Sequence, residues 1–218
     1  MLSRCDCGGG GVDVELGRPF AVVTPTLDGD VLTVLARADK QYTPGDLRRL
    51  LGRSVAGLRL VLQRLVEQGV VCEQRTSSSV LYSLNPRHLA AEPIRALASL
   101  RATLLDRISD TMNGWDQKAV FAALFGSAAR GDMRPDSDLD LFLVRPDPVA
   151  ADDESWHRQL ATLAEQITSW TGNDARVLEY TEARVRAGGE PVLAVIADEG
   201  VPVAGTMRWL RSVMRAGA

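Results

Sequence analysis

The chain has 218 residues, of which 45% are hydrophobic and 5% aromatic, and its formal net charge at pH 7 is −3. This length suits two small domains, whose cores must be built mainly from leucine and valine. The acidic balance excludes a protein that binds nucleic acid over its whole surface, but it allows a local basic face. No apolar run reaches the roughly 18 residues of a membrane-spanning helix, so we expect no membrane partner.

Residues 1–22 include the run CDCGGGG, which predicts a flexible N-terminal tail. Two sulfurs, on Cys5 and Cys7, make a poor zinc site when no histidine or further cysteine lies nearby. Together with Cys72 they give an odd number of cysteines and no signal-peptide pattern, which is typical of a reducing compartment. We therefore expect a cytoplasmic protein.

Residues 23–88 show three helical patterns followed by two short strands. In the second pattern Thr43 suits an N-cap, Pro44 the first helical position and Gly52 the end of the helix. The strands flank the polar loop 76–79 and predict a hairpin. This order predicts a winged helix-turn-helix domain. The stripe that we expect to be buried in the second helix consists of Leu47, Leu50 and Leu51.

This segment is also locally basic. From Arg37 to Arg75 there are eight basic and four acidic residues, a net charge of +4. A winged helix places its third helix in the major groove of DNA, so Arg59 and Gln63 on that helix and Arg75 in the hairpin are candidates for contacts with bases or phosphates. The alternative is that the arginines form an ordinary solvated face and that the domain docks another protein.

Residues 89–115 predict one connecting helix with an apolar stripe. The stripe contains Leu97, Leu100, Leu104 and Ile108. It can pack in the core of a single chain or pair two chains in a homodimer, and both alternatives are open at this point.

Residues 116–218 alternate strands and helices. Apolar runs at 119–125 and 139–144 predict two buried strands, and the pattern at 153–170 predicts an amphipathic helix. A third strand follows at 175–180, and the later segments look helical. We expect an α/β (α+β) protein in which a small mixed-sheet domain follows the winged helix-turn-helix.

Asp138 and Asp140 stand at the start of the second strand, and ten residues separate Asp138 from the pair Gly126-Ser127. Side chains two residues apart on a strand share a face, and two carboxylates so close repel unless a cation lies between them. Mg²⁺ takes one or two carboxylates together with substrate phosphates. A glycine lets the backbone approach a phosphate, and Ser127 adds a hydroxyl. The pattern therefore predicts a site for a divalent metal ion and a nucleoside triphosphate.

These residues resemble the nucleotidyltransferase superfamily of DNA polymerase beta, and most of all its minimal bacterial and archaeal members. The resemblance rests on Gly126-Ser127, ten residues, Asp138-x-Asp140, with Arg130 inside and Ser137 before the first aspartate. It implies that the aspartates bind two Mg²⁺ (or Mn²⁺) ions and that Gly126, Ser127 and Ser137 belong to the triphosphate site. It also implies transfer of a nucleoside monophosphate to a hydroxyl of a protein, an RNA or a small molecule. Arg130 either braces the loop through an ion pair, which we favour, or reaches a phosphate.

One feature departs from that family, which normally has a third carboxylate on a later strand. The aligned position here is Arg176, and Asp174 is the better of two nearby substitutes because Glu179 has the opposite strand parity. We therefore expect Asp138, Asp140 and Asp174 to be the catalytic residues of a metal-dependent nucleotidyltransferase. Two alternatives are a DNA-binding regulator that senses a nucleotide through a degenerate site and an antitoxin-like partner protein.

Overall fold

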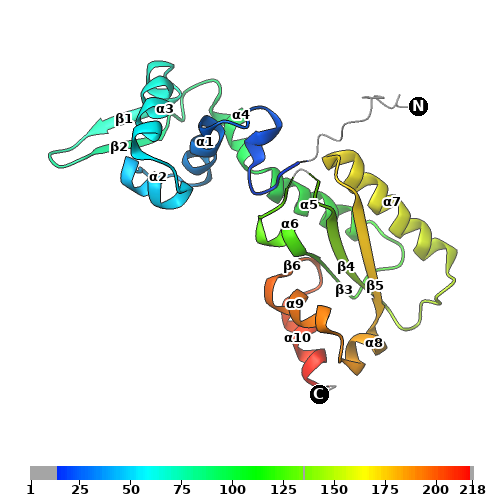
Figure 1. Cartoon of the computed structure of the whole chain (residues 1–218). Coiled ribbons are helices and arrows are strands. Elements are labelled where there is room, and N and C mark those ends of the chain that lie inside the picture. Colours follow the sequence, from blue (N-terminus) through cyan, green and yellow to red (C-terminus); the bar gives the residue numbers. More distant parts are fainter. Residues whose placement is uncertain (1–13, 135, 217–218) are drawn as a thin grey trace, which may run out of the picture. The chain divides into compact units, whose positions relative to one another are not determined.

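The structure is a computed structural model that describes residues 14–134 and 136–216 (Figure 1). Within this range, residues 18–103 form one compact unit, and residues 14–17 and 104–216 form the other. We call them the N-terminal and the C-terminal unit. The predicted cysteine pair at positions 5 and 7, and Pro135, lie outside the described residues. No helix in the described part is long and apolar enough to cross a bilayer.

The N-terminal unit has the predicted order of three helices and a hairpin. The short helix η1 (Pro19–Val22) comes first, followed by α1 (Leu27–Arg37), α2 (Pro44–Leu51), α3 (Val55–Glu67), β1 (Val71–Arg75), β2 (Val80–Leu84) and α4 (Ala91–Ala98). β1 and β2 pair antiparallel. One hydrophobic core joins the helices to the hairpin, and Val31, Leu47, Leu58 and Leu62 are fully buried in it.

The predicted ends of α2 are present. The Thr43 side chain accepts a hydrogen bond from the Asp46 N–H, and the Asp46 carboxylate accepts one from the Thr43 N–H, so the two residues form a capping box. Gly52 ends the helix with a φ of 65°. The prediction that Leu50 is buried was wrong, because its side chain is 60% exposed. Because α2 is a short helix that turns about 100° per residue, its narrow buried face is centred on Leu47 and excludes Leu50.

The segment expected as one connecting helix contains two. α4 ends at Ala98, Ser99 has non-helical backbone angles, and α5 (Leu100–Asn113) begins directly after it. The expected stripe therefore serves two cores. Leu97 of α4 packs against the core of the N-terminal unit, whereas Leu104 and Ile108 of α5 are buried in the C-terminal unit.

The C-terminal unit is built on a four-stranded mixed sheet in the order β5-β4-β3-β6. β3 pairs antiparallel with β4 and β6, while β4 and β5 are parallel. The strands are β3 (Phe121–Phe125), β4 (Leu139–Arg145), β5 (Ala175–Thr181) and β6 (Val201–Ala204). The helices are α6 (Gly126–Arg130), α7 (Glu154–Thr171), α8 (Glu182–Ala187), α9 (Pro191–Glu199) and α10 (Met207–Ala216).

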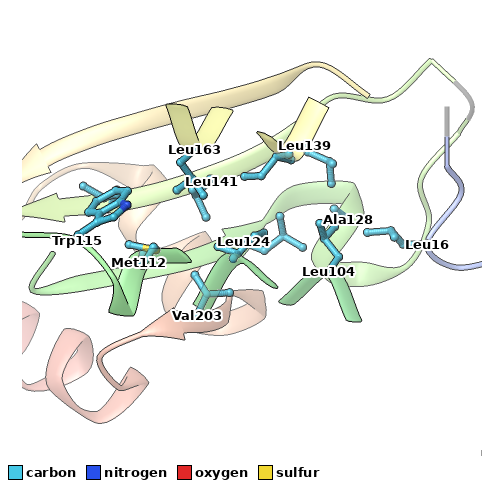
Figure 2. Close-up of a cluster of buried hydrophobic side chains, with 14 of the residues drawn as sticks. Leu16, Leu104, Met112, Trp115, Leu124, Ala128, Leu139, Leu141, Leu163 and Val203 are labelled. Carbon is cyan, nitrogen blue, oxygen red and sulfur yellow. The ribbon is translucent and has the colours of Figure 1, made fainter. Parts of the chain in front are cut away.

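Alternation along β4 divides the apolar side chains between the two faces of this sheet. Leu139 and Leu141 join the cluster that also contains residues of α5 and α7 (Figure 2). In this cluster the Trp115 and Trp156 rings meet edge to face, with centroids 5.7 Å apart. Phe142 packs on the opposite face with residues from α8, α9 and α10. A strand that is buried on both faces is mainly apolar, and in β4 the run from Leu141 to Val144 follows Asp140 at the start of the strand.

Two expectations about the ends of this unit were wrong. The tail was expected to extend to residue 22, but Leu16 is 1% exposed within the α5–α7 cluster, and the Val14 N–H donates to the Thr171 carbonyl at 3.2 Å. The segment after α9 was expected to be helical, but it includes strand β6. Pro202 is tolerated there because β6 is an edge strand, where a missing N–H costs no ladder hydrogen bond.

Candidate active site

The sheet register brings Gly126 next to Asp140. Phe125, the last residue of β3, pairs with Asp140 of β4, and Gly126 follows Phe125 directly. A Cβ atom on Gly126 would lie 2.8 Å from Asp140 Oδ2, and the φ of Gly126 is +70°. Only glycine combines this backbone angle with so close a carboxylate. The predicted phosphate-binding turn and the predicted metal ligand are therefore direct neighbours.

Asp138 and Asp140 act on each other electrostatically. Asp138 directly precedes β4 and Asp140 is its second residue, and both side chains are half-buried. Burial raises the pKa of Asp140 above its ordinary value, and the negative charge of Asp138 raises this pKa further. The positive charge of Arg176 acts in the opposite direction on the same pKa. The pair is therefore a region of excess negative charge that favours a cation.

Arg176 already supplies one positive charge to this pair. It lies opposite Asp140 in the parallel register of β4 and β5, and its Nη1 atom is 2.7 Å from Asp138 Oδ2. Its Nε atom lies 3.7 Å from Asp174 Oδ2. Asp174, the expected substitute for a third carboxylate, therefore reaches the site through Arg176. The Asp174 side chain is 72% exposed, whereas that of Asp138 is 30% exposed.

The backbone N–H of Gly126 is bonded to a residue that the sequence patterns did not indicate. It donates to Glu199 Oε1 at 3.2 Å. Arg130 Nη1 donates to both oxygens of the same carboxylate, at 2.8 and 3.0 Å, and Arg130 Nε donates to Asp132 Oδ2 at 3.2 Å. Arg130 thus forms the ion pair that the sequence analysis favoured. Glu199 ends α9, 73 residues after Gly126, and reaches the turn because β6 pairs with β3.

The remaining predicted residues lie in the same loop. Ser127 is half-buried at the start of α6, and its carbonyl accepts hydrogen bonds from the N–H groups of Gly131 and Asp132. Ser137 Oγ accepts a hydrogen bond from the Arg134 N–H at 2.9 Å. The Ser137 carbonyl accepts another from Asn173 Nδ2 at 3.0 Å. Ser137 therefore shapes the loop that leads into the aspartates.

The residues at the site offer oxygen ligands of the kind that Mg²⁺ prefers. Asp138 and Asp140 present two carboxylates side by side, and a nucleotide would add phosphate oxygens. In residues 14–134 and 136–216 no group of three histidine, cysteine, aspartate or glutamate side chains is placed to hold a metal ion. The donor set therefore fits an ion shared between two carboxylates and a phosphate ligand, and it does not form a cage made of protein alone.

The predicted DNA contacts gather at one concave surface of the N-terminal unit, which we call the α3–hairpin cavity. Its volume is about 760 Å³, and Arg59, Gln63 and Arg75 all line it. Two of the three are engaged with acidic side chains: Gln63 Nε2 donates to Glu67 Oε1 at 3.0 Å and Arg75 Nε donates to Glu73 Oε1 at 2.7 Å. The other lining residues are Thr43, Pro44, Gly45, Val55, Glu73, Ser78, Ser79, Val80 and Tyr82.

Comparison with known proteins shows what the C-terminal unit is similar to. Two crystal structures of toxin–antitoxin proteins are similar to the chain at low identity. One, described as containing AMP-PNP, shares 17% identity over 52% of this chain and 82% of the other, with a TM-score of 0.39. The other, described as MntA-HepT, shares 15% identity over 53% of this chain and 82% of the other, with a TM-score of 0.36. No curated protein matches the sequence. Residues 108–183, which contain both aspartates, match the family model described as "Nucleotidyltransferase domain", and this match supports nucleotidyltransferase activity.

Proposed function

We propose that the C-terminal unit is a metal-dependent nucleotidyltransferase. In this proposal a nucleoside triphosphate binds with Mg²⁺ or Mn²⁺, and the enzyme transfers its nucleoside monophosphate to a hydroxyl group of a protein, an RNA or a small molecule. The observation that carries the proposal is the contact between the glycine turn and the carboxylate pair: a Cβ on Gly126 would meet Asp140 Oδ2 at 2.8 Å. A phosphate at the turn and a cation at the carboxylates would therefore touch each other. The matched nucleotidyltransferase domain supports this activity.

Asp138 and Asp140 would hold the metal ion in this reaction. Its chemistry would be to polarise the phosphate oxygens and neutralise the charge that develops on them. The carboxylates suit this role because they are partly buried, so water screens them less than it screens surface charges. Asp140 must be ionised to serve as a ligand, and a cation favours that form.

The phosphates would be bound by groups that now hold Glu199. The Gly126 N–H and the Arg130 guanidinium both bond to that carboxylate. A phosphate carries the same negative charge as a carboxylate and accepts the same hydrogen bonds. Binding the triphosphate therefore requires Glu199 to release these two donors.

The bond changes follow from this placement. The acceptor hydroxyl oxygen attacks the α-phosphorus, a new P–O bond forms, and the bond between the α-phosphorus and the bridging oxygen breaks to release pyrophosphate. The hydroxyl proton goes to a carboxylate, for which we propose Asp174. Its side chain is largely exposed, so an acceptor from solvent can reach it.

Incubation with a triphosphate labelled at the α-phosphate, followed by separation of protein, RNA and small-molecule fractions of a lysate, tests this activity. Label should appear in one fraction with Mg²⁺ and should be lost in the Asp138→Asn, Asp140→Asn double variant. Tight nucleotide binding without label in any fraction would instead favour the regulator that senses a nucleotide. The specific observation behind that second candidate is Arg176, which pairs with Asp138 at the position expected for a carboxylate.

For the N-terminal unit we propose DNA binding by a winged helix-turn-helix. Support comes from the net charge of +4 between positions 37 and 75 and from the α3–hairpin cavity that Arg59, Gln63 and Arg75 share. Arg and Gln side chains on one helix can reach base edges while the hairpin contacts phosphates. Electrophoretic mobility shifts with genomic fragments at low salt would test it.

A further inference from the structure

Arg176 occupies part of the coordination space of the aspartate pair. Its Nη1 atom bonds to Asp138 Oδ2 at 2.7 Å, and the β4–β5 register places it opposite Asp140. This ion pair uses one oxygen of Asp138. It leaves Asp138 Oδ1 and the Asp140 carboxylate for a divalent ion, which needs only one or two carboxylates when phosphates and water complete its shell.

A second ion would need ligands that this chain does not offer at that place. Ions in two-metal sites lie about 3.5–4 Å apart, so the two ions share a small set of oxygen ligands. In the described part of the chain no three acidic, histidine or cysteine side chains are grouped for a metal. One oxygen of Asp138 is bonded to the Arg176 guanidinium, which leaves fewer free carboxylate oxygens for a second ion, and the charge of the guanidinium repels a nearby cation.

The position of Arg176 is secured from two sides, although its side chain is 64% exposed. Strand β5 fixes its backbone next to β4, and Asp174 Oδ2 attracts its Nε atom at 3.7 Å. A planar guanidinium suits both carboxylate and phosphate oxygens, so the same group can serve as a counter-charge for a triphosphate. The Arg176 guanidinium therefore supplies a positive charge at the site whether or not a metal ion is bound.

We propose that Arg176 replaces one divalent ion, so that the site binds a nucleoside triphosphate with a single Mg²⁺ or Mn²⁺ ion and with Arg176 as the second positive charge. This inference rests on the proposed function, because it assumes that the aspartates bind metal and nucleotide. It differs from the two ions that the resemblance implies. In this proposal Arg176 determines how many metal ions the site binds.

The test is to count Mn²⁺ ions bound to the full chain in the presence of a non-hydrolysable triphosphate, by calorimetry and by the electron paramagnetic resonance signal of free Mn²⁺. The wild type should bind about one ion per chain. Arg176→Asp removes the guanidinium and adds a carboxylate opposite Asp140, and it should bind about two. Arg176→Gln should bind Mn²⁺ alone about two- to fivefold more tightly, which is the size expected for the loss of a competing ion pair of partial exposure.

Arg186→Gln is the matched control. Arg186 is also on the C-terminal unit, its side chain is 54% exposed, and it pairs with Asp147 and Glu182 at 3.7 Å. This variant removes the same charge and should bind metal as the wild type does. Thermal unfolding of each variant checks that its fold is retained.

The outcomes separate the role of Arg176 from the proposed function. A wild type that binds two ions, or an Arg176→Asp variant that still binds one, overturns the role of Arg176 and leaves the proposed function in place. If the wild type binds no Mn²⁺, or if the Asp138→Asn, Asp140→Asn variant binds as much Mn²⁺ as the wild type, the proposed function is overturned and the inference with it.

Discussion

Glu199 accepts a hydrogen bond from the backbone N–H of Gly126 at 3.2 Å. The same carboxylate is paired with Arg130, at 2.8 Å. A negatively charged side chain from the end of α9 is thus bonded to the turn that we propose for a phosphate. In the proposed function the nucleotide displaces this carboxylate, so the charge of Glu199 would affect the free energy of nucleotide binding.

Glu199→Gln should therefore bind a triphosphate about three- to tenfold more tightly than the wild type, because a neutral amide competes less well than a carboxylate for charged donors. Calorimetric titration with a non-hydrolysable triphosphate and Mg²⁺ measures the effect. Asp198→Asn is the control, since this exposed neighbour on the same helix loses the same charge. An equal gain in both variants would show a general charge effect and not a role for Glu199.

Replacing both aspartates, Asp138→Asn with Asp140→Asn, should abolish the Mg²⁺-dependent part of triphosphate binding. Even residues that only orient metal ligands change metal affinity by about 10- to 100-fold, so loss of the ligands should exceed that. Titrations with and without Mg²⁺ isolate the metal-dependent part of the affinity. Asp152→Asn, an exposed acid in the same unit, should leave it unchanged.

Asp174→Asn should slow nucleotidyl transfer and leave triphosphate affinity nearly unchanged. If the Asp174 carboxylate accepts the proton of the attacking hydroxyl, its contribution appears in the transition state and not in ground-state binding. General-base assistance is worth about 10² to 10⁴-fold in rate. Single-turnover rates with a labelled triphosphate, together with calorimetric affinities, provide both quantities. Full activity of this variant would show that a group other than Asp174 accepts the proton of the attacking hydroxyl.

In the N-terminal unit, Arg59→Ala and Gln63→Ala should each weaken binding to a specific duplex by about 1–3 kcal/mol, the range for a lost base contact. Fluorescence anisotropy with a selected genomic fragment at several salt concentrations measures this loss and its salt dependence. Arg87→Ala is the control, because this exposed arginine is not among the lining residues of the α3–hairpin cavity. A wild type that binds no fragment at low salt would refute DNA binding.

Gly126→Ala should destabilise the C-terminal unit by at least about 1–2 kcal/mol. A left-handed backbone angle costs this much for a residue with a Cβ, and here the new atom would also meet Asp140 Oδ2 at 2.8 Å. Gly45→Ala is the contrasting substitution, since its Cβ meets no atom closer than 3.5 Å and it lies inside α2. It should increase stability by up to about 1 kcal/mol. Thermal unfolding of both variants tests this contrast.

The elements whose signals are local can be predicted from the amino-acid sequence alone. The Thr43 cap and the Gly52 end of α2 follow from short-range hydrogen bonds, and the apolar run of β4 follows from burial on both faces. The pattern of Gly126, Asp138 and Asp140 predicted that the glycine turn and the carboxylates lie together, and the pairing of β3 with β4 does bring Gly126 next to Asp140.

Only the tertiary structure decided which charges meet at that site. Arg176 comes to Asp138 through the parallel pairing of β4 and β5, and Glu199 comes to Gly126 through the pairing of β6 with β3. No local pattern marks either contact, since the partners are 38 and 73 residues apart and each arginine or glutamate alone is typical of a solvated surface. The register of the strands, which depends on the packing of the whole sheet, converts these surface charges into parts of the site.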